Sequence, residues 1–374
     1  MVPKTALQMH STVHEDGFVS LELLEVDIPS PKSNEVVIEM RAAPINPSDL
    51  GTMLAFADPS AMESATGAHG PVAKAPLSEA ALKAAAARVG EAIALGNEGS
   101  GVVVASGSDD LAKSLMGRTV AIRGGCYAQY RCVPARECLV LPEGTEPKDA
   151  ASCFVNPLTA LGMVETMRLE GHAGLVHTAA ASNLGQMLQR ICTADDVPLV
   201  NIVRRGPQCE VLRGIGAQHV CDTSGDDFDD ALTDALAATG ATLGFDATGG
   251  GRLASQILAA MERALSRGSG FSRYGSTTWK QVYLYGNLQL GPTELSRTYG
   301  MAWGIGGWLL PNFLTRIGPE ASQRLRDRVA AEITTTFASH YTKVISLPEA
   351  LDPQHIAHYQ RKSTGEKFLI ALDG

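Results

Sequence analysis

The segment from Gly174 to Gly286 constrains the fold most, because short apolar strand patterns alternate there with amphipathic helix patterns. The strand patterns "GLVHTA" and "PLVNIV" are separated by the helix pattern "NLGQMLQRICTAD", and further strand–helix units follow. A helical crossover is the usual connection between neighbouring parallel strands. Repeated units of this length therefore predict an α/β domain with a doubly wound parallel sheet of the Rossmann type.

The two flanks of this segment have a different pattern. The first third contains strand patterns bounded by turns and glycines, among them "VVIEMRAAPI" and "GRTVAIRGG", and the tail after residue 343 predicts strand, helix, turn and strand. An alanine-rich stretch, residues 77–93, interrupts the strands and predicts one extra helix with Ser78 as its N-cap. Its expected apolar face consists of Leu82, Ala86, Val89 and Ile93.

Composition excludes several classes of protein. Apolar residues make up 45% of the 374 residues, which argues against disorder, and the net charge of −9 argues against a general nucleic-acid binder. The start lacks a basic segment followed by an apolar run, and the apolar stretch at 301–314 is too short to span a bilayer. The seven cysteines form no C-x-x-C pair. We therefore expect a cytoplasmic protein with reduced thiols, without membrane or nucleic-acid partners.

The turn after the first strand of a doubly wound sheet is where a dinucleotide phosphate binds. In this turn, "TAAASNLGQ", the three glycine positions of a G-x-x-G-x-x-G spacing hold Ala179, Ser182 and Gly185. Small residues still permit close approach of a pyrophosphate, although an ordinary tight turn would show the same pattern. The predicted phosphate-binding residues are Ala180, Ser182, Asn183, Leu184 and Gly185.

The end of the second strand indicates which dinucleotide binds. Sites for NAD usually carry an acidic residue there, whereas "VNIVRRGPQ" carries Arg204 and Arg205. Guanidinium groups bind phosphate through paired, charge-assisted hydrogen bonds, so the pattern predicts NADPH, with a solvated basic turn as the alternative. Thr248 and Gly249, and Gly286, follow later strands where a dinucleotide would cross the edge of the sheet.

Several motifs in a fixed order resemble one family. They include "APINPSDL", "GNEGSGVV", "YAQYRCVPA", "FVNPLTALGMV" and the terminal "GEKFLI", and they span almost the whole chain. The chain thereby resembles the medium-chain dehydrogenase/reductase superfamily, in particular its zinc-free quinone oxidoreductase branch.

This resemblance implies a GroES-like, partly open β-barrel catalytic domain joined to a Rossmann cofactor domain, with the active-site cleft between them. We expect the catalytic domain at residues 1–154 and 315–374, with a helical insertion at about 57–93, and the NADPH-binding domain at 155–314. The insertion is expected to pack beside the cleft and narrow access to it. A homodimer is implied as well.

The resemblance also bears on metal. At the positions where zinc-dependent members hold their catalytic ion, this chain has Asn46, Asn97 and Asn156. Amide oxygens bind zinc weakly compared with thiolate and imidazole, so we predict no metal site. Without a Lewis acid, hydride transfer from NADPH to a small quinone or activated α,β-unsaturated carbonyl acceptor is the expected reaction.

Further site residues follow from the same resemblance. Asn46 is expected to contact the cofactor ribose, Asn156 and Thr159 to lie at the nicotinamide end, and Lys367 to reach the cofactor. A purely structural role is the alternative for three of these residues: Asn46 as a turn residue, Thr159 as a hydroxyl at a helix N-terminus and Lys367 as a surface lysine. Tyr127 and Tyr130, expected to alternate on one strand, are candidate proton donors, although packed core tyrosines fit equally well.

Two other functions stay open. Enoyl-thioester reductases of the superfamily also carry "NPSD", but they place a tyrosine proton donor where this chain has Ala57. The third possibility is a dinucleotide-binding protein that has a structural or regulatory role and no turnover.

Overall fold

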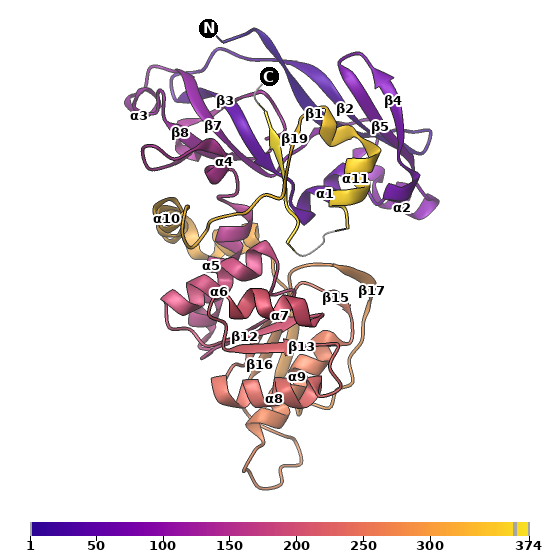
Figure 1. Cartoon of the computed structure of the whole chain (residues 1–374), viewed down its shortest axis with the longest axis vertical. Coiled ribbons are helices and arrows are strands. Elements are labelled where there is room, and N and C mark those ends of the chain that lie inside the picture. The colour runs from indigo at the N-terminus through magenta and orange to yellow at the C-terminus, as the bar shows by residue number, and fades with distance from the viewer. Residues whose placement is uncertain (1, 362–364, 373–374) are drawn as a thin grey trace. The chain divides into compact units, whose positions relative to one another are not determined.

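The computed structural model describes residues 2–361 and 365–372, and the chain folds into two compact units. Unit 1 comprises residues 1–155 and 326–374, and unit 2 comprises residues 156–325. Figure 1 shows the strand-rich unit 1 and the α/β unit 2. Helices α5 (Val155–Glu170) and α10 (Leu310–Ala331) carry the chain from one unit to the other, and α10 kinks at Gly318.

Unit 2 has a parallel six-stranded sheet in the order β13-β12-β11-β14-β16-β18, which confirms the predicted Rossmann-type sheet. The strands are β11 (Leu175–His177), β12 (Leu199–Val203), β13 (His219–Asp222), β14 (Leu243–Asp246), β16 (Lys280–Leu284) and β18 (Trp303–Gly307), with a separate pair formed by β15 (Gly249–Gly251) and β17 (Gln289–Thr293). The crossover helices are α6 (Asn183–Ala194), α7 (Gly206–Arg213), α8 (Phe228–Thr239) and α9 (Leu253–Leu265). Strands β11 and β12 are buried on both faces, so burial is continuous along them and includes the polar residues His177 and Asn201.

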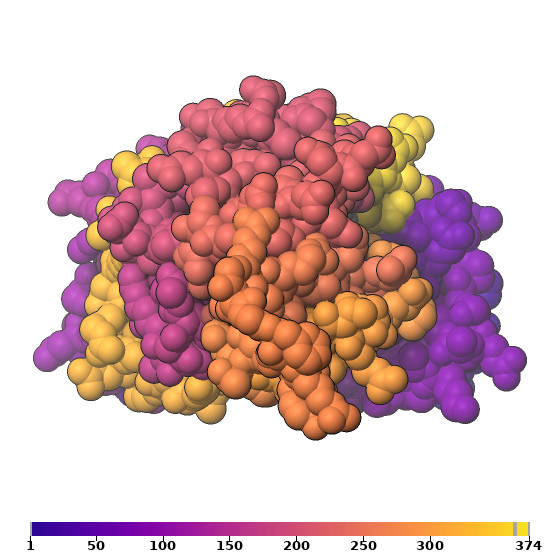
Figure 2. Space-filling view, turned by 90° about the horizontal axis from the view of Figure 1, so that it is seen from below, coloured from indigo at the N-terminus to yellow at the C-terminus, as the bar shows by residue number. Residues whose placement is uncertain are grey.

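The loop between α9 and β16 projects from unit 2, as Figures 1 and 2 show. Phe271 on this loop is 97% exposed. The base of the loop is fixed by a buried ion pair between Lys280 and Glu262, whose Nζ and Oε2 atoms lie 2.7 Å apart. Glu262 also accepts a hydrogen bond from the backbone amide of Ser276, so both ends of the loop are tied to one carboxylate.

Unit 1 contains two largely antiparallel sheets. The first has the order β4-β5-β2-β1-β6 and the second has the order β10-β8-β7-β3-β20-β19, with β9 paired to β3. Their strands are β1 (Thr5–Val13), β2 (Phe18–Asp27), β3 (Glu35–Pro44), β4 (Glu63–Gly67), β5 (Gly70–Pro76), β6 (Ala92–Ala94), β7 (Glu98–Ser106), β8 (Thr119–Arg123), β9 (Tyr130–Pro134), β10 (Leu139–Val140), β19 (Lys343–Ser346) and β20 (Phe368–Ala371). The short helices are α1 (Pro47–Leu54), α2 (Glu79–Ala84), α3 (Asp110–Ser114), α4 (Pro147–Ala150) and α11 (Pro353–Tyr359). Strand β20 from the tail pairs antiparallel with β3, so the end of the chain completes a sheet begun near its start.

The alanine-rich stretch differs from the predicted single helix. Helix α2 covers only six residues, with Ser78 accepting a hydrogen bond from the amide of Ala81 as its N-cap. Ala81 and Ala85 are buried, whereas Ala86 is exposed. Gly90, at a φ of 80°, turns the chain away from helix, and strand β6 then pairs with β1. Pairing along the edge of a sheet outweighs the helix propensity of alanine here.

The segment that precedes α2 was expected as part of a helical insertion. It instead forms the β4–β5 hairpin, and β5 pairs with β2. Arg88 fixes the end of the insertion by donating hydrogen bonds to the carbonyl oxygens of Thr52 and Ser11. The insertion is thus built into the first sheet of unit 1.

Candidate functional site

In unit 2, the turn between β11 and α6 forms the candidate phosphate cradle. Ser182 is the N-cap of α6, and its hydroxyl oxygen accepts a hydrogen bond of 3.2 Å from the amide of Gly185. A Cβ atom on Gly185 would lie 2.1 Å from the carbonyl oxygen of Ala180, so only glycine fits where the helix meets the turn. Asn183 and Leu184 form the first turn of α6. The N-terminus of this helix is therefore shaped to approach an anion closely.

Two arginines follow β12. Arg204 and Arg205 are both exposed, and Arg205 occupies the N-cap position of α7. The backbone amide of Arg204 donates to the side-chain oxygen of Gln208 at 2.9 Å, which fixes the course of the chain at this point. Strand β12 lies beside β11, so the arginines and the phosphate cradle follow neighbouring strands at the same edge of the sheet. This arrangement suits a dinucleotide with an additional phosphate.

A buried carboxylate organises the turn after β14. Asp246 accepts hydrogen bonds from the Thr178 hydroxyl at 2.8 Å and from the amides of Thr248 and Gly249. A Cβ atom on Gly249 would lie 2.5 Å from the carbonyl oxygen of Gly286, so the two turns cross closely. Gly286 also lines a cavity of about 800 Å³, including its open mouth, at the carboxyl ends of β16 and β18. Ligands of open α/β sheets bind at this edge.

In unit 1, Asn46 is held by a fully buried carboxylate. Glu98 accepts a hydrogen bond of 2.8 Å from Nδ2 of Asn46, one of 3.2 Å from the Ser152 hydroxyl, and two from the amides of Phe154 and Val155. Four donors satisfy the charge that burial would otherwise penalise. Glu98 is thus a structural anchor for Asn46.

Lys367 approaches the same network from the segment just before β20. It is 8% exposed, and its Nζ donates to the Ser152 hydroxyl at 2.8 Å and lies 5.6 Å from the ring centre of Tyr341. Burial lowers the pKa of Lys367 to about 8, and the charge of Glu98 opposes that shift. Lys367 is therefore buried and is not the surface lysine that the structural alternative described.

Asp49 is the second buried carboxylate beside Asn46. It accepts hydrogen bonds of 2.8 Å from the amides of Asn46 and Asn97. Burial raises the pKa of Asp49 to about 7 against the effect of these amides. Among residues 2–361 and 365–372, no group of three or more His, Cys, Asp and Glu side chains could hold a metal ion.

The two candidate tyrosines lie in different environments. Tyr127 precedes β9, is fully buried and donates its hydroxyl to the carbonyl oxygen of Pro44 at 3.1 Å. Tyr130 begins β9, is partly exposed and donates to Glu39 at 3.2 Å. The expectation that both alternate on one strand is therefore wrong, because β9 begins only at Tyr130.

Asn156 and Thr159 lie in the first turns of α5 and are 8% and 7% exposed.

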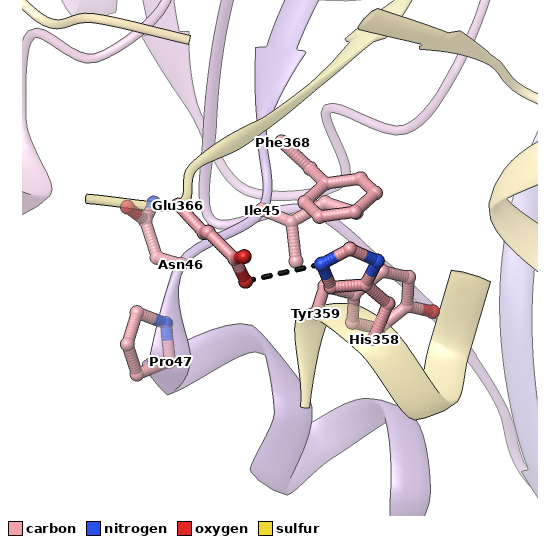
Figure 3. A pocket seen from close by; sticks show the side chains of 7 residues that line it. All are labelled: Ile45, Asn46, Pro47, His358, Tyr359, Glu366 and Phe368. Carbon is pink, nitrogen blue, oxygen red and sulfur yellow. Dashed lines mark hydrogen bonds and ion pairs between the residues drawn. The ribbon is translucent and has the colours of Figure 1, made fainter. Parts of the chain in front are cut away.

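A pocket beside Asn46 contains two polar residues that the sequence analysis did not single out, His358 and Glu366 (Figure 3). The His358 Nε2 and Glu366 Oε2 atoms lie 3.0 Å apart. The residues are eight positions apart, one on α11 and one just before β20, and neither belongs to a motif that predicts a proton donor. Only the pairing of β20 with β3 brings them to the turn that holds Asn46.

Comparisons with known proteins agree with this architecture. A family model for the alcohol dehydrogenase GroES-like domain matches residues 32–143. The mitochondrial enoyl-[acyl-carrier-protein] reductase of Bos taurus is 27% identical over 214 residues, covering 55% of this chain and 50% of that protein. The corresponding protein of Xenopus tropicalis is 30% identical over 216 residues, covering 55% and 53%. The matched region thus spans about half the length of these curated relatives.

Solved structures are similar over the whole chain. A putative NADPH:quinone reductase from Mesorhizobium loti has a TM-score of 0.71 at 24% identity, covering 99% of both chains. A mutant form of enoyl thioester reductase from Candida tropicalis has a TM-score of 0.70 at 17% identity, covering 99% of this chain and 100% of the other. At these identities the likeness shows the shared fold.

An antiparallel GroES-like domain combined with a six-stranded parallel Rossmann sheet defines a dehydrogenase-type fold. The chain therefore shares the fold of dehydrogenases and reductases that combine a GroES-like domain with a Rossmann domain, and the match at residues 32–143 agrees with the predicted resemblance. Its structural neighbours include a putative NADPH:quinone reductase and an enoyl thioester reductase. No helix among the described residues is long and apolar enough to cross a membrane.

Proposed function

We propose that this protein is a metal-free, NADPH-dependent oxidoreductase that reduces a quinone or another activated α,β-unsaturated carbonyl. The observation that carries the proposal is the cradle at Gly185 with Arg204 and Arg205 after the neighbouring strand. Backbone amides at a helix N-terminus suit the pyrophosphate, and the two guanidinium groups suit the 2′-phosphate of NADPH. The bound cofactor would supply a hydride.

The chemistry of unit 1 supports an electrophilic acceptor. Asn46 directs its amide group at Glu98, whose oxygens accept four hydrogen bonds in all, and the pattern contains no thiolate or imidazole at Asn46, Asn97 or Asn156. A reaction that needs a Lewis acid to stabilise an alkoxide is therefore disfavoured by the residue types present. An acceptor with a conjugated carbonyl needs less assistance, because it is already polarised.

The second candidate is an enoyl-thioester reductase. It is favoured by the curated relatives, which are named enoyl-[acyl-carrier-protein] reductases, and by the enoyl thioester reductase among the structural neighbours. Against it stands Ala57, which is 7% exposed and has no proton to give at the position of the expected tyrosine. A homodimer and a cytoplasmic location remain part of the proposal.

One experiment separates these functions. NADPH consumption is followed by absorbance with a panel of quinones, small enones and enoyl thioesters. Turnover with quinones or enones in excess of enoyl thioesters is expected, whereas the reverse order supports the second candidate. Tight NADPH binding without turnover on any member of the panel would instead indicate a structural or regulatory dinucleotide-binding protein.

A further inference from the structure

The pocket beside Asn46 has an apolar wall and a polar end. Ile45 and Phe368 form part of the wall, and Asn46, His358 and Glu366 supply the polar groups. Its volume is about 40 Å³, which is room for a few water-sized groups. The carbonyl group of an acceptor would fit such a space, whereas the rest of the acceptor would lie outside it.

The polar pair has the geometry of a carboxylate that orients an imidazole. Figure 3 shows the Glu366 carboxylate directed at His358, with Asn46 and Pro47 on the other side of the carboxylate. The side chains of His358 and Glu366 are 40% and 41% exposed, so the pair can exchange protons with solvent. Ion pairs with this exposure contribute little to folding stability.

The surroundings leave Glu366 as the carboxylate that contacts His358 among the described residues. The ring of Phe368 packs edge-on against the imidazole, with centroids 5.1 Å apart. Tyr359, which also lines the pocket, donates its hydroxyl to the carbonyl oxygen of Ala350. Lys343 lies 5.7 Å from the ring centre of Phe368 and donates to His355, and the backbone amide of Arg361 donates to the carbonyl oxygen of His358. Neither residue lines the pocket.

We propose that Glu366 and His358 form the proton-donating pair of this enzyme, with Glu366 delivering the proton to an acceptor beside Asn46 and His358 resupplying it from solvent. The inference rests on the proposed function, because it needs a hydride-accepting carbonyl compound. It assigns the proton donor that neither Ala57 nor the buried Tyr127 supplies.

The proton balance is simple. Bound NADPH would supply a hydride, and the acceptor that takes it up would carry a negative charge as an enolate or a hydroquinone anion. The proton on Nε2 of protonated His358 passes to the Glu366 carboxylate, and the resulting carboxyl group transfers it to the α-carbon or oxygen of the reduced acceptor. The pair is left as neutral imidazole and carboxylate, and water returns one proton to the imidazole.

The test compares H358N and E366Q with the matched control H355N. His355 lies one turn earlier on the same helix and bonds Lys343 instead of the pocket. Two quantities are measured for each protein: NADPH affinity by fluorescence, and kcat against pH for an enone and a quinone.

We expect H358N and E366Q to lower kcat for the enone at least about 100-fold, the lower end of general acid catalysis. The decrease for a quinone should be smaller, because an oxygen anion takes a proton from water readily. NADPH affinity should be unchanged in all variants, and H355N should keep the wild-type kcat. The double variant should lose no more than the singles.

Folding is checked separately by a thermal melt of each variant. Both positions are partly exposed and both replacements are polar, so the variants should fold as the wild type does. The variant E366D, which keeps a carboxylate, should recover part of the rate that E366Q loses.

Two results overturn the proposal. One is an unchanged kcat and pH profile for the enone in both H358N and E366Q, with the wild-type protein active. The other is an H355N variant that loses as much kcat for the enone as H358N does. An inactive wild-type protein on the whole panel would instead overturn the proposed function.

Discussion

Asp49 should make the stability of this protein fall as the pH rises from 4 to 7. Its carboxyl group is 2% exposed, and burial raises its pKa from 3.8 to about 7. Over that interval the native state keeps a proton that the unfolded chain has released, so the free energy of unfolding decreases with pH. At about 1.4 kcal/mol per pKa unit, the full decrease is about 4 kcal/mol, of which about 3 kcal/mol falls between pH 5 and pH 8.

The variant D49N tests this reasoning, because it removes the titration and keeps the shape of the side chain. An amide has one accepting oxygen, so the variant loses one of the two bonds from the amides of Asn46 and Asn97, at a cost of about 1–3 kcal/mol. Relative to wild type, D49N should therefore be less stable at pH 5 and should gain about 3 kcal/mol by pH 8. Urea unfolding at both pH values measures the difference.

The variant D58N is the matched control for D49N. Asp58 also accepts a backbone hydrogen bond, from the amide of Ser60, but it is exposed and its pKa is lowered by the Ser60 hydroxyl and amide. D58N should show no gain in relative stability between pH 5 and pH 8. If D49N and wild type lose stability in parallel over this range, Asp49 is ionised at low cost and the argument from burial is wrong.

Three further outcomes are expected. Substituting Arg204 and Arg205 by Ala should weaken NADPH binding by about one to two decades and leave NADH binding nearly unchanged, because a charge-assisted phosphate contact is worth about 1.5–3 kcal/mol. Equal affinities of the wild-type protein for NADPH and NADH would contradict this prediction. G185A should abolish dinucleotide binding and lower the melting temperature, because the new Cβ atom would lie 2.1 Å from a carbonyl oxygen. The control G51A, whose Cβ atom would have no neighbour within 4 Å, should change neither property. Fluorescence titration measures the binding and calorimetry measures the melting temperature. The pKa of Lys367 is lowered from 10.5 to about 8, so between pH 8 and 10.5 the native state binds fewer protons than the unfolded chain does. The free energy of unfolding of the wild-type protein should therefore rise by about 3 kcal/mol across that interval. Urea unfolding of K367M should not show this rise.

The sequence predicted the parts of the fold that depend on local periodicity. The strands and helices between residues 174 and 286 lie where apolar runs and amphipathic patterns placed them, and the parallel, doubly wound sheet follows from their alternation. The prediction failed for residues 77–93, where alanine content indicated one helix and strand β6 instead pairs with β1. Such pairing is not visible in local composition, because it depends on an edge that a distant strand provides.

Site residues show the same division. Ser182 and Gly185 were identifiable because the strand–turn–helix pattern fixes their spacing, and each occupies the position that the spacing indicated. The hydrogen-bond donors of Glu98 come from residues 46 and 152–155, which no local signal connects to it. His358 and Glu366 were missed entirely. Their significance arises from β20 lying beside β3, which brings the tail to the turn at Asn46.

The polar interior of unit 1 shows how its two buried carboxylates are accommodated. Two buried carboxylates, Glu98 and Asp49, would repel each other without compensation. Amide groups from the backbone and from Asn46 surround them, Lys367 supplies one positive charge through Ser152, and Asp49 can retain a proton near neutral pH. The hydrogen bonds, the lysine charge and the retained proton each offset the negative charge of the two carboxylates. The same network holds the amide group of Asn46 at Glu98, and under the proposed function this fixes one polar group of the pocket in which the acceptor would bind.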